Sequence, residues 1–324
     1  MSGVPDIAAS IDALRANGVE RIVLTGSSGL LGANAVLEIA GRTGLVGWTA
    51  GEPIAHPDVE FAAVDITDSG AVDAAMHAAA PQLVVHLAAA TDVDRCQREP
   101  AWSEAVNVTG ARNVARAAAA VGARLVHVST DSVYGGDTAL HTEAETPAPA
   151  NVYAADKLRG ELSALDAVSD ALVARVTMVG FTPTGGRGLL EWALGRLEAG
   201  ERISGFDDVF FNPVHAPDLV AGLLGLAARG ASGVVNLAGS ERASKYEFLR
   251  ALAGAFGYDP DLVAASTVAD VAFDAPRPAD TSMDVSRAES IGVVLPDLAG
   301  CCERIRAAAD AGRPQALRAL MRGE

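Results

Sequence analysis

Short hydrophobic runs alternate with longer amphipathic stretches through the first 178 residues of the chain. A continuous apolar run of four to six residues is typical of a strand that helices cover on both faces, as in a parallel sheet. Stretches with apolar residues every three or four positions predict the covering helices. The pattern predicts strands over residues 21–25, 45–49, 61–64, 83–87, 124–129 and 172–177, and helices over 71–80, 102–120 and 151–168 among others. It therefore predicts an α/β fold with a doubly wound parallel sheet.

The regular alternation loosens beyond residue 178, where a long loop at 182–186 and several prolines interrupt the chain. We expect residues 1–178 to form the sheet domain and residues 179–324 to form a smaller lobe. One further strand is expected over residues 233–237, so about residues 206–240 would return to the main sheet and the lobe would be interleaved with it. An additional helix over residues 6–17 would be capped by Asp6.

The first predicted strand leads directly into a glycine-rich loop, residues 25–32, with the sequence Thr-Gly-Ser-Ser-Gly-Leu-Leu-Gly. The order strand, glycine turn, helix is typical of phosphate binding in dinucleotide folds. Gly26 would permit the tight turn, Gly29 would let the backbone approach a pyrophosphate, and Gly32 would allow close packing of the helix on the strand. Taken alone, the spacing is also explained by a loop that serves only the turn.

A phenol and an ammonium lie one helical turn apart in the helix predicted over residues 151–168. Tyr153 and Lys157 share one face of that helix because they are four residues apart, so the ammonium can stabilise a phenolate. The hydroxyl of Thr130, at the end of a predicted strand, would hold a substrate oxygen. The three groups indicate acid–base chemistry at a carbonyl or an alcohol. A surface pair at positions i and i+4 is the alternative explanation of the tyrosine and the lysine.

These residues resemble the extended short-chain dehydrogenase/reductase family. The resemblance rests on the glycine loop, Asp65 with Ile66, His-Leu-Ala-Ala-Ala at 86–90, Asn107, Ser-Thr-Asp at 129–131, and Tyr153 with Lys157. Within the family, the chain is similar to the dTDP-4-dehydrorhamnose reductase group through residues 89–94, 129–136, 149–161, 277–284 and 295–297. Ala154 and Asp156 depart from the residues usual in that group, so the sugar is left open.

The resemblance implies a Rossmann domain that binds NAD(P) over residues 1–178 and a substrate-binding lobe over 179–324. It implies three catalytic residues: Thr130, Tyr153 and Lys157. The cofactor would contact the glycine loop, two strand ends and the catalytic pair, namely Gly26, Ser28, Gly29, Leu30, Leu31, Asp65, Ile66, Leu87, Ala88, Ala89, Tyr153 and Lys157. The substrate would contact Thr91, Val93, Asp131, Ser132 and Arg277, where the guanidinium would meet a diphosphate. For Arg277, a plain surface ion pair is the alternative.

The end of the second predicted strand bears on the choice of cofactor. NAD-specific enzymes usually place an acid about 20 residues after the glycine loop, where it binds the ribose 2′-hydroxyl. Here the strand ends in Trp-Thr-Ala-Gly at 48–51, and Glu52 stands later than that position. We therefore expect NADPH, with NADH as the other possibility.

Three functions fit these motifs. The first is reduction of the 4-keto group of a nucleotide-activated deoxysugar, with hydride from the nicotinamide and a proton from Tyr153. The second is an NAD-dependent sugar-nucleotide epimerase or dehydratase, and a dehydratase is disfavoured because Ser132 stands where that group has glutamate. The third is a non-catalytic regulatory member of the family.

Composition excludes several other classes. The net charge of −16 argues against nucleic-acid partners, since phosphate backbones attract basic surfaces. Three cysteines give no disulfide framework, and no run approaches the roughly 18 apolar residues of a membrane span. No histidine pair has zinc-ligand spacing, so we expect no metal. A cytoplasmic protein without membrane partners is expected, and the family resemblance adds a possible homodimer.

Overall fold

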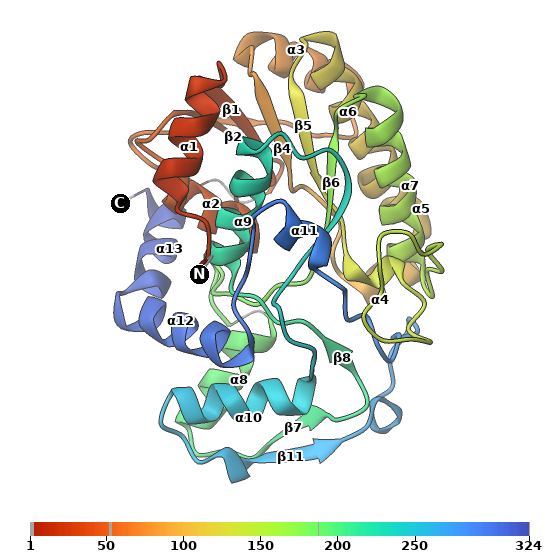
Figure 1. The fold of residues 1–324 in the computed structure, drawn as a ribbon, viewed down its shortest axis with the longest axis vertical. Coiled ribbons are helices and arrows are strands. Elements are labelled where there is room, and N and C mark those ends of the chain that lie inside the picture. The colour runs from red at the N-terminus through yellow and green to blue at the C-terminus, as the bar shows by residue number, and fades with distance from the viewer. Residues whose placement is uncertain (1–2, 52–53, 187, 324) are drawn as a thin grey trace.

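One parallel sheet of seven strands organises the computed structural model, which describes residues 3–51, 54–186 and 188–323 (Figure 1). The strand order is β3-β2-β1-β4-β5-β6-β9, so the winding reverses between β1 and β4. The bounds are β1 (Arg21–Thr25), β2 (Gly44–Thr49), β3 (Glu60–Ala63), β4 (Leu83–His86), β5 (Arg124–Val128), β6 (Leu172–Val176) and β9 (Gly233–Leu237). Each predicted strand lies within one residue of an observed one at both ends. The prediction of a doubly wound parallel sheet is confirmed.

Helices cover both faces of the sheet and bury its side chains in two separate cores. Ile22 and Leu24 of β1 pack in one core, whereas Val23 between them packs in the other, as the alternation of side chains along a strand requires. The first core receives α1 (Ile7–Ala16), α2 (Leu30–Ile39), α9 (Ala216–Ala228), α12 (Leu298–Asp310) and α13 (Arg313–Arg322). The second receives α3 (Ser69–Ala79), α6 (Ala111–Ala120) and α7 (Val152–Ala167).

The N-terminal helix forms as predicted. The Asp6 side chain accepts a hydrogen bond from the backbone N–H of Ala9 at 2.7 Å, which is the N-cap contact that the sequence indicates. Buried Ile11 and Leu14 belong to the first core, and α1 packs against α9. The segment therefore extends the helical layer on that face of the sheet.

The single helix predicted over residues 102–120 is wrong in its middle. The chain forms α5 (Pro100–Glu104), then a π-helical turn (Ala105–Gly110), and only then α6. The Asn107 side chain accepts from the Ala90 N–H at 2.9 Å and donates to the Ala90 carbonyl at 3.1 Å. These two bonds join the π-helical turn to the loop after β4, 17 residues earlier in the chain.

A smaller lobe lies below the sheet in Figure 1. It contains two short strand pairs, β7 (Ile203–Phe206) with β11 (Val263–Ser266) and β8 (Phe210–Phe211) with β10 (Ala243–Ser244). Because α9 and β9 fall between these segments in the sequence, the chain leaves the lobe, joins the sheet and returns. The remaining elements are α4 (Val93–Arg98), α8 (Leu189–Glu198), α10 (Lys245–Ala255), α11 (Ser286–Ser290) and the 3-10 turns Asp131–Val133, Pro260–Leu262 and Val268–Asp270.

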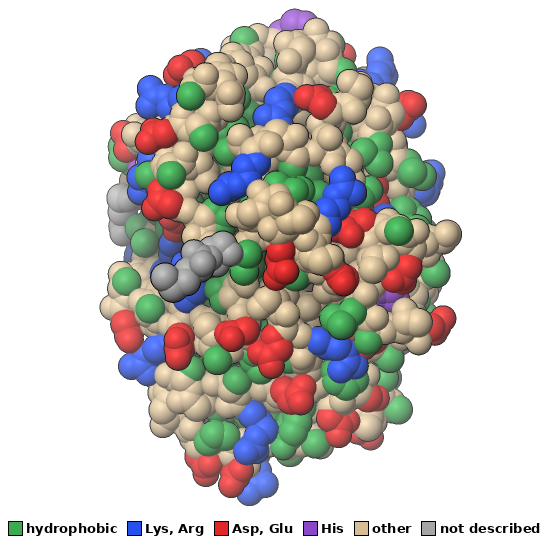
Figure 2. All heavy atoms as spheres, in the orientation of Figure 1, with side chains coloured by type: hydrophobic (Ala, Val, Ile, Leu, Met, Phe, Trp, Pro, Cys, Tyr) green, Lys and Arg blue, Asp and Glu red, His purple; other side chains and the backbone are tan. Residues whose placement is uncertain are grey.

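Acidic and basic side chains are interspersed on the face of the molecule shown in Figure 2, and no broad basic area interrupts them there. This distribution agrees with the net charge of −16. Among the described residues, no helix combines the length and the apolar character that crossing a membrane requires.

A buried ion pair joins the sheet to helix α7. Arg175 of β6 and Glu161 of α7 are 4% and 2% exposed, and their side chains form three hydrogen bonds, Nη2 to Oε2 at 2.8 Å, Nε to Oε1 at 3.1 Å and Nε to Oε2 at 3.3 Å. The hydroxyl of Ser129 also donates to Glu161, and Arg175 donates to the Tyr134 hydroxyl at 2.9 Å. Each buried charge is therefore met by a partner and by hydrogen bonds, which is the condition for tolerating it away from water.

We expect Glu161→Ala to lower the free energy of unfolding by about 3–5 kcal/mol, because it leaves the Arg175 guanidinium buried without its counter-charge. Urea denaturation followed by circular dichroism measures the change. The matched control is Glu104→Ala, which removes the carboxylate of the exposed Arg159–Glu104 pair and should cost less than about 1 kcal/mol. Equal losses in the two variants would contradict the structural importance of the buried pair.

Candidate active site

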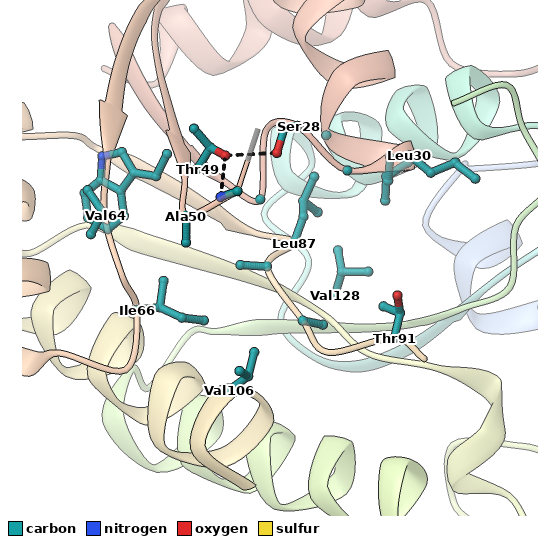
Figure 3. A pocket seen from close by; sticks show the side chains of 18 of the residues that line it. Ser28, Leu30, Thr49, Ala50, Val64, Ile66, Leu87, Thr91, Val106 and Val128 are labelled. Carbon is teal, nitrogen blue, oxygen red and sulfur yellow. Dashed lines mark hydrogen bonds between the residues drawn. The ribbon is translucent and has the colours of Figure 1, made fainter. Parts of the chain in front are cut away.

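A cleft of about 390 Å³ opens at the carboxyl ends of the sheet strands, and its lining includes residues that follow β1 and β4 (Figure 3). Doubly wound folds bind ligands where the strand order reverses, and here that point lies between these two strands. The cleft is lined by all twelve residues that the resemblance assigns to the cofactor and by Thr91. Their contacts with a cofactor stay a prediction, but the fold brings the whole set together.

The glycine loop has the backbone that close approach to a phosphate requires. Gly26 adopts φ +68°, and a Cβ there would lie 2.8 Å from the Ala88 backbone. A Cβ on Gly32 would lie 2.1 Å from the Gly26 carbonyl oxygen, so no side chain fits at that position. Gly29 is the N-cap of α2, and no side chain caps the first turn. The free amides of this helix start line the cleft, which fits a dinucleotide pyrophosphate.

The residues that end β2 and follow β3 line the cleft beside the glycine loop, and they are suited to the adenosine half of a dinucleotide. The hydroxyls of Ser28 and Thr49 lie 2.9 Å apart, and the Gly51 N–H donates to Thr49 at 3.2 Å (Figure 3). No acid stands among the described residues that end β2, and Glu52 lies outside the described residues. Asp65 accepts from the N–H and the hydroxyl of Thr67 at 2.9 and 2.8 Å, so its carboxylate is fixed at the cleft edge.

The predicted catalytic pair, Tyr153 and Lys157, is positioned by the start of helix α7. Asn151 caps this helix by accepting from the Ala154 N–H at 2.9 Å, and it donates to the Pro276 carbonyl of the lobe at 3.0 Å. Tyr153 and Lys157 follow within the first two turns, and both line the cleft. The Lys157 ammonium donates to the carbonyl of Val128, the last residue of β5, at 2.7 Å.

Thr130 follows β5 and completes the predicted catalytic set, although the cleft lining contains its neighbour Ser129 instead. Its hydroxyl donates to Asp131 Oδ1 at 3.0 Å and accepts from the Ser132 N–H at 3.2 Å. It also lies within hydrogen-bonding reach of Tyr153, since a bond from Thr130 lowers the pKa of that phenol. Tyr153 and Lys157 therefore line the cleft, and Thr130 lies beside the phenol.

Burial is the largest influence on the pKa values of the predicted catalytic pair, Tyr153 and Lys157. It raises the pKa of Tyr153 to about 12, against the smaller lowering by Thr130. It lowers the pKa of Lys157 to about 8, against the negative charge of Glu161 one turn further along α7. The lowering of the Tyr153 pKa by Lys157 stays a prediction. A protonated phenol suits a proton donor at neutral pH.

The residues predicted to contact the substrate are only partly brought together. Thr91 lines the cleft, Val93 begins α4, and Asp131 and Ser132 belong to the turn after Thr130. Arg277 is paired with Asp94, Nη2 to Oδ2 at 2.8 Å, and its guanidinium lies 4.6 Å from the Phe273 ring centroid. The ion pair with Asp94 agrees with the alternative explanation given for Arg277, and a diphosphate contact stays a prediction.

Several residues of the cleft were not predicted. Trp48 and Thr49 end β2, so the rule that ligands bind at strand ends would have found them. Val106 belongs to the π-helical turn, and Met178 follows β6. No local signal in the sequence marks the last two, because their position depends on tertiary contacts. No cluster of three or more potential ligands within the described ranges is arranged to hold a metal ion.

Residues 20–303 match the model of a single protein family, described as the RmlD substrate binding domain. The chain belongs to the RmlD substrate-binding-domain family. The match includes the whole sheet, the cleft and most of the smaller lobe, whereas α1 and α13 lie outside it. The predicted resemblance is confirmed at the level of the family.

The proteins to which this chain is similar include reductases and a subunit of another enzyme. A dTDP-4-dehydrorhamnose reductase of Mycobacterium tuberculosis is 36% identical over 266 residues, which cover 80% of this chain and 83% of the relative. Methionine adenosyltransferase 2 subunit beta of Pongo abelii is 30% identical over 294 residues, covering 84% and 83%. The crystal structure of a dTDP-4-dehydrorhamnose reductase from Bacillus anthracis in complex with NADP has a TM-score of 0.80 at 25% identity and covers 89% of this chain and 98% of that one.

We expect Gly32→Ala to weaken NADPH binding by at least about tenfold, because the added methyl group displaces the Gly26 carbonyl and with it the phosphate loop. Titration of the protein with NADPH, followed by cofactor fluorescence, measures the dissociation constant. Gly195→Ala is the matched control, since a Cβ on that residue of α8 meets no atom within 4 Å. Unchanged affinity in a folded Gly32→Ala protein would contradict the assignment of the loop.

Proposed function

We propose that this protein is an NADPH-dependent reductase of the 4-keto group of a nucleotide-activated deoxysugar. The observation that carries the proposal is that Tyr153 and Lys157 line the same cleft as the glycine loop, with Thr130 beside the phenol. The identity to a dTDP-4-dehydrorhamnose reductase over 80% of the chain supports it independently.

The chain's own groups have distinct tasks in this reaction. When bound, the nicotinamide supplies the hydride that the carbonyl carbon accepts. Tyr153 gives its phenolic proton to the carbonyl oxygen, and burial keeps the phenol protonated until then. Thr130 holds the same oxygen by its hydroxyl. The Lys157 ammonium donates to the Val128 carbonyl and lines the cleft, where it can also donate to the ribose hydroxyls of a bound cofactor.

NADPH is the expected cofactor because the described end of β2 offers no acid to repel a 2′-phosphate and because a structural neighbour was solved with NADP. The hydroxyls of Ser28 and Thr49 stand near that position and can donate to phosphate oxygens. NADH stays the second possibility, since neighbours of lower identity were solved with NAD. The expected cytoplasmic location and homodimer also stay predictions.

A non-catalytic role is the second candidate, because one group of relatives bears the name of a subunit of another enzyme. A subunit of this kind predicts no turnover with any sugar nucleotide, and an epimerase predicts turnover without net consumption of NADPH. The test is a panel of nucleotide-linked 4-keto sugars scored for NADPH oxidation at 340 nm. Net oxidation that requires the sugar supports the reductase and contradicts both alternatives.

Tyr153→Phe should lower the turnover number by about 10²–10⁴-fold, because it removes the proton donor, while NADPH affinity stays nearly unchanged. Steady-state kinetics on a sugar that the wild-type protein reduces gives the first quantity, and fluorescence titration gives the second. Tyr246→Phe, on helix α10, is the matched control and should keep wild-type turnover. A Tyr153→Phe variant with undiminished turnover would remove the proposed proton donor.

The reduction should lose efficiency as the pH rises through about 8. Lys157 carries its charge below its pKa of about 8 and loses it above, whereas Tyr153 remains protonated up to about 12. The profile of kcat/KM against pH reports the ionisation of the free enzyme. The expected curve therefore falls on its alkaline side near pH 8, and a flat profile from pH 7 to 10 would show that the Lys157 charge is not needed.

A further inference from the structure

A short segment of the smaller lobe, residues 279–283, runs beside the turn that carries Thr130. Strand β8 fixes the backbone of this segment through two hydrogen bonds. The Phe210 N–H donates to the Ala279 carbonyl at 2.8 Å, and the Thr281 N–H donates to the Phe210 carbonyl at 3.1 Å. Thr281 is therefore held in place by the lobe, and the proposed mechanism assigns it no task.

The hydroxyl of Thr281 has one proton and two acceptors within reach. Asp131 Oδ2 lies at 2.6 Å, whereas the Phe210 carbonyl oxygen lies at 3.4 Å, so the proton is shared with the carboxylate. Thr281 and Asp131 are 8% and 9% exposed, so water has little access to this bond. The bond joins the smaller lobe to the turn after β5, 150 residues earlier in the chain.

The other oxygen of Asp131 receives hydrogen bonds from its own turn. The hydroxyls of Thr130 and Ser132 donate to Oδ1 at 3.0 and 3.3 Å. Because the two oxygens of a carboxylate lie in one rigid plane, a donor that holds Oδ2 also decides where Oδ1 points. Loss of the Thr281 hydroxyl would leave a buried carboxylate oxygen unpaired, and the carboxylate would turn toward its remaining donors.

Two bonds set the direction of the Thr130 hydroxyl. It donates to Asp131 Oδ1 at 3.0 Å and accepts from the Ser132 N–H at 3.2 Å. The hydroxyl and the methyl group of a threonine share one Cβ and occupy staggered positions, so the bond to Asp131 selects one χ1 rotamer. In that rotamer the hydroxyl lies beside the phenol of Tyr153. Another rotamer would carry it away from the phenol.

We infer that Thr281 is a positioning residue that acts through Asp131 to orient the hydroxyl of Thr130. The smaller lobe thereby contributes to the geometry of a site whose predicted catalytic groups all lie on the sheet domain. The effect of Thr281 on turnover rests on the proposed reductase function. Its effect on the Thr130 side chain does not depend on that function, so separate measurements test the two parts.

Nuclear magnetic resonance tests the orientation without any substrate. In protein labelled with nitrogen-15 and with carbon-13 at the threonine methyl groups, the three-bond coupling between methyl carbon and backbone nitrogen measures χ1. Thr130→Ser assigns the Thr130 signal by removing it. We expect the coupling of a single rotamer in the wild-type protein and in Thr281→Ser, and an averaged or different coupling in Thr281→Val, which lacks the hydroxyl donor. Thr43→Val is the matched control, since that hydroxyl donates to the Glu20 carbonyl before β1 and β2, at the end of the sheet away from the cleft.

Kinetics tests the consequence for the reaction. Thr281→Val should lower kcat about tenfold with NADPH affinity unchanged, which is the size of effect expected from one hydrogen bond to a charged group. Thr281→Ser should recover most of the loss because it restores the donor. The double variant Thr130→Ala/Thr281→Val should be no slower than Thr130→Ala alone, because the hydroxyl that Thr281 orients is then absent. Thr43→Val should keep wild-type turnover.

The outcomes separate the inference from the proposed function. A changed Thr130 coupling in Thr281→Val, with no turnover of the wild-type protein on any sugar, supports the positioning role and overturns the reductase. A Thr130 coupling that is the same in Thr281→Val overturns the inference, whatever the activity. Losses of kcat that multiply in the double variant also overturn it, since they show two independent effects. If Thr281→Val does not fold, Thr281→Ala, which is smaller and also lacks the donor, replaces it in both measurements.

Discussion

The buried pair of Glu161 and Arg175 is the contact on which the arrangement of this site depends. A carboxylate and a guanidinium withdrawn from water require near-ideal geometry, so they fix α7 on β6 with little freedom. Ser129 adds the end of β5 to the same carboxylate. Tyr153 and Lys157 lie on α7, and Thr130 follows Ser129, so this ion pair contributes to the relative position of the three predicted catalytic groups. Glu161 also supports the charge of Lys157.

Local patterns were enough to predict the sheet and half of the site. Strands that helices cover on both faces need continuous apolar runs, and a turn without room for a Cβ needs glycine. Both features are therefore visible as patterns of neighbouring residues. The helix of Tyr153 was predictable for the same reason, since Asn151 caps it directly. The π-helical turn was not, because it depends on the bridge from Asn107 to Ala90.

The smaller lobe shows where such prediction ends. Strands of two residues, such as β8 and β10, are too short for any hydrophobic period to be visible. Asp131 and Thr281 are 150 residues apart, and Arg175 and Glu161 are 14 apart on different elements. No pattern near one residue of either pair predicts its partner. Arg277 looked available for a phosphate because its partner Asp94 lies 183 residues away.

Relatives of this chain bear the names of a reductase and of a subunit of another enzyme, so similarity alone does not decide between chemistry and assembly. A catalytic role depends on a few side chains in and beside the cleft. In this chain the phenol, the ammonium and the hydroxyl are all present, and the turn that carries Thr130 is tied to the smaller lobe through Asp131. The lobe that would select a substrate is thus physically joined to the groups that would transform it.

Helices α1 and α13 lie beyond the range that the family model covers, yet both pack on the layer that contains α2. Arg313 at the start of α13 forms an ion pair with Glu38 near the end of α2, and the other end of α2 begins at Gly29. The helix whose first turn faces the cleft is thus held at its other end by a residue outside the matched range. Shortening the chain to residues 20–303 would remove the Arg313–Glu38 ion pair, and with it a contact that holds the helix behind the glycine loop.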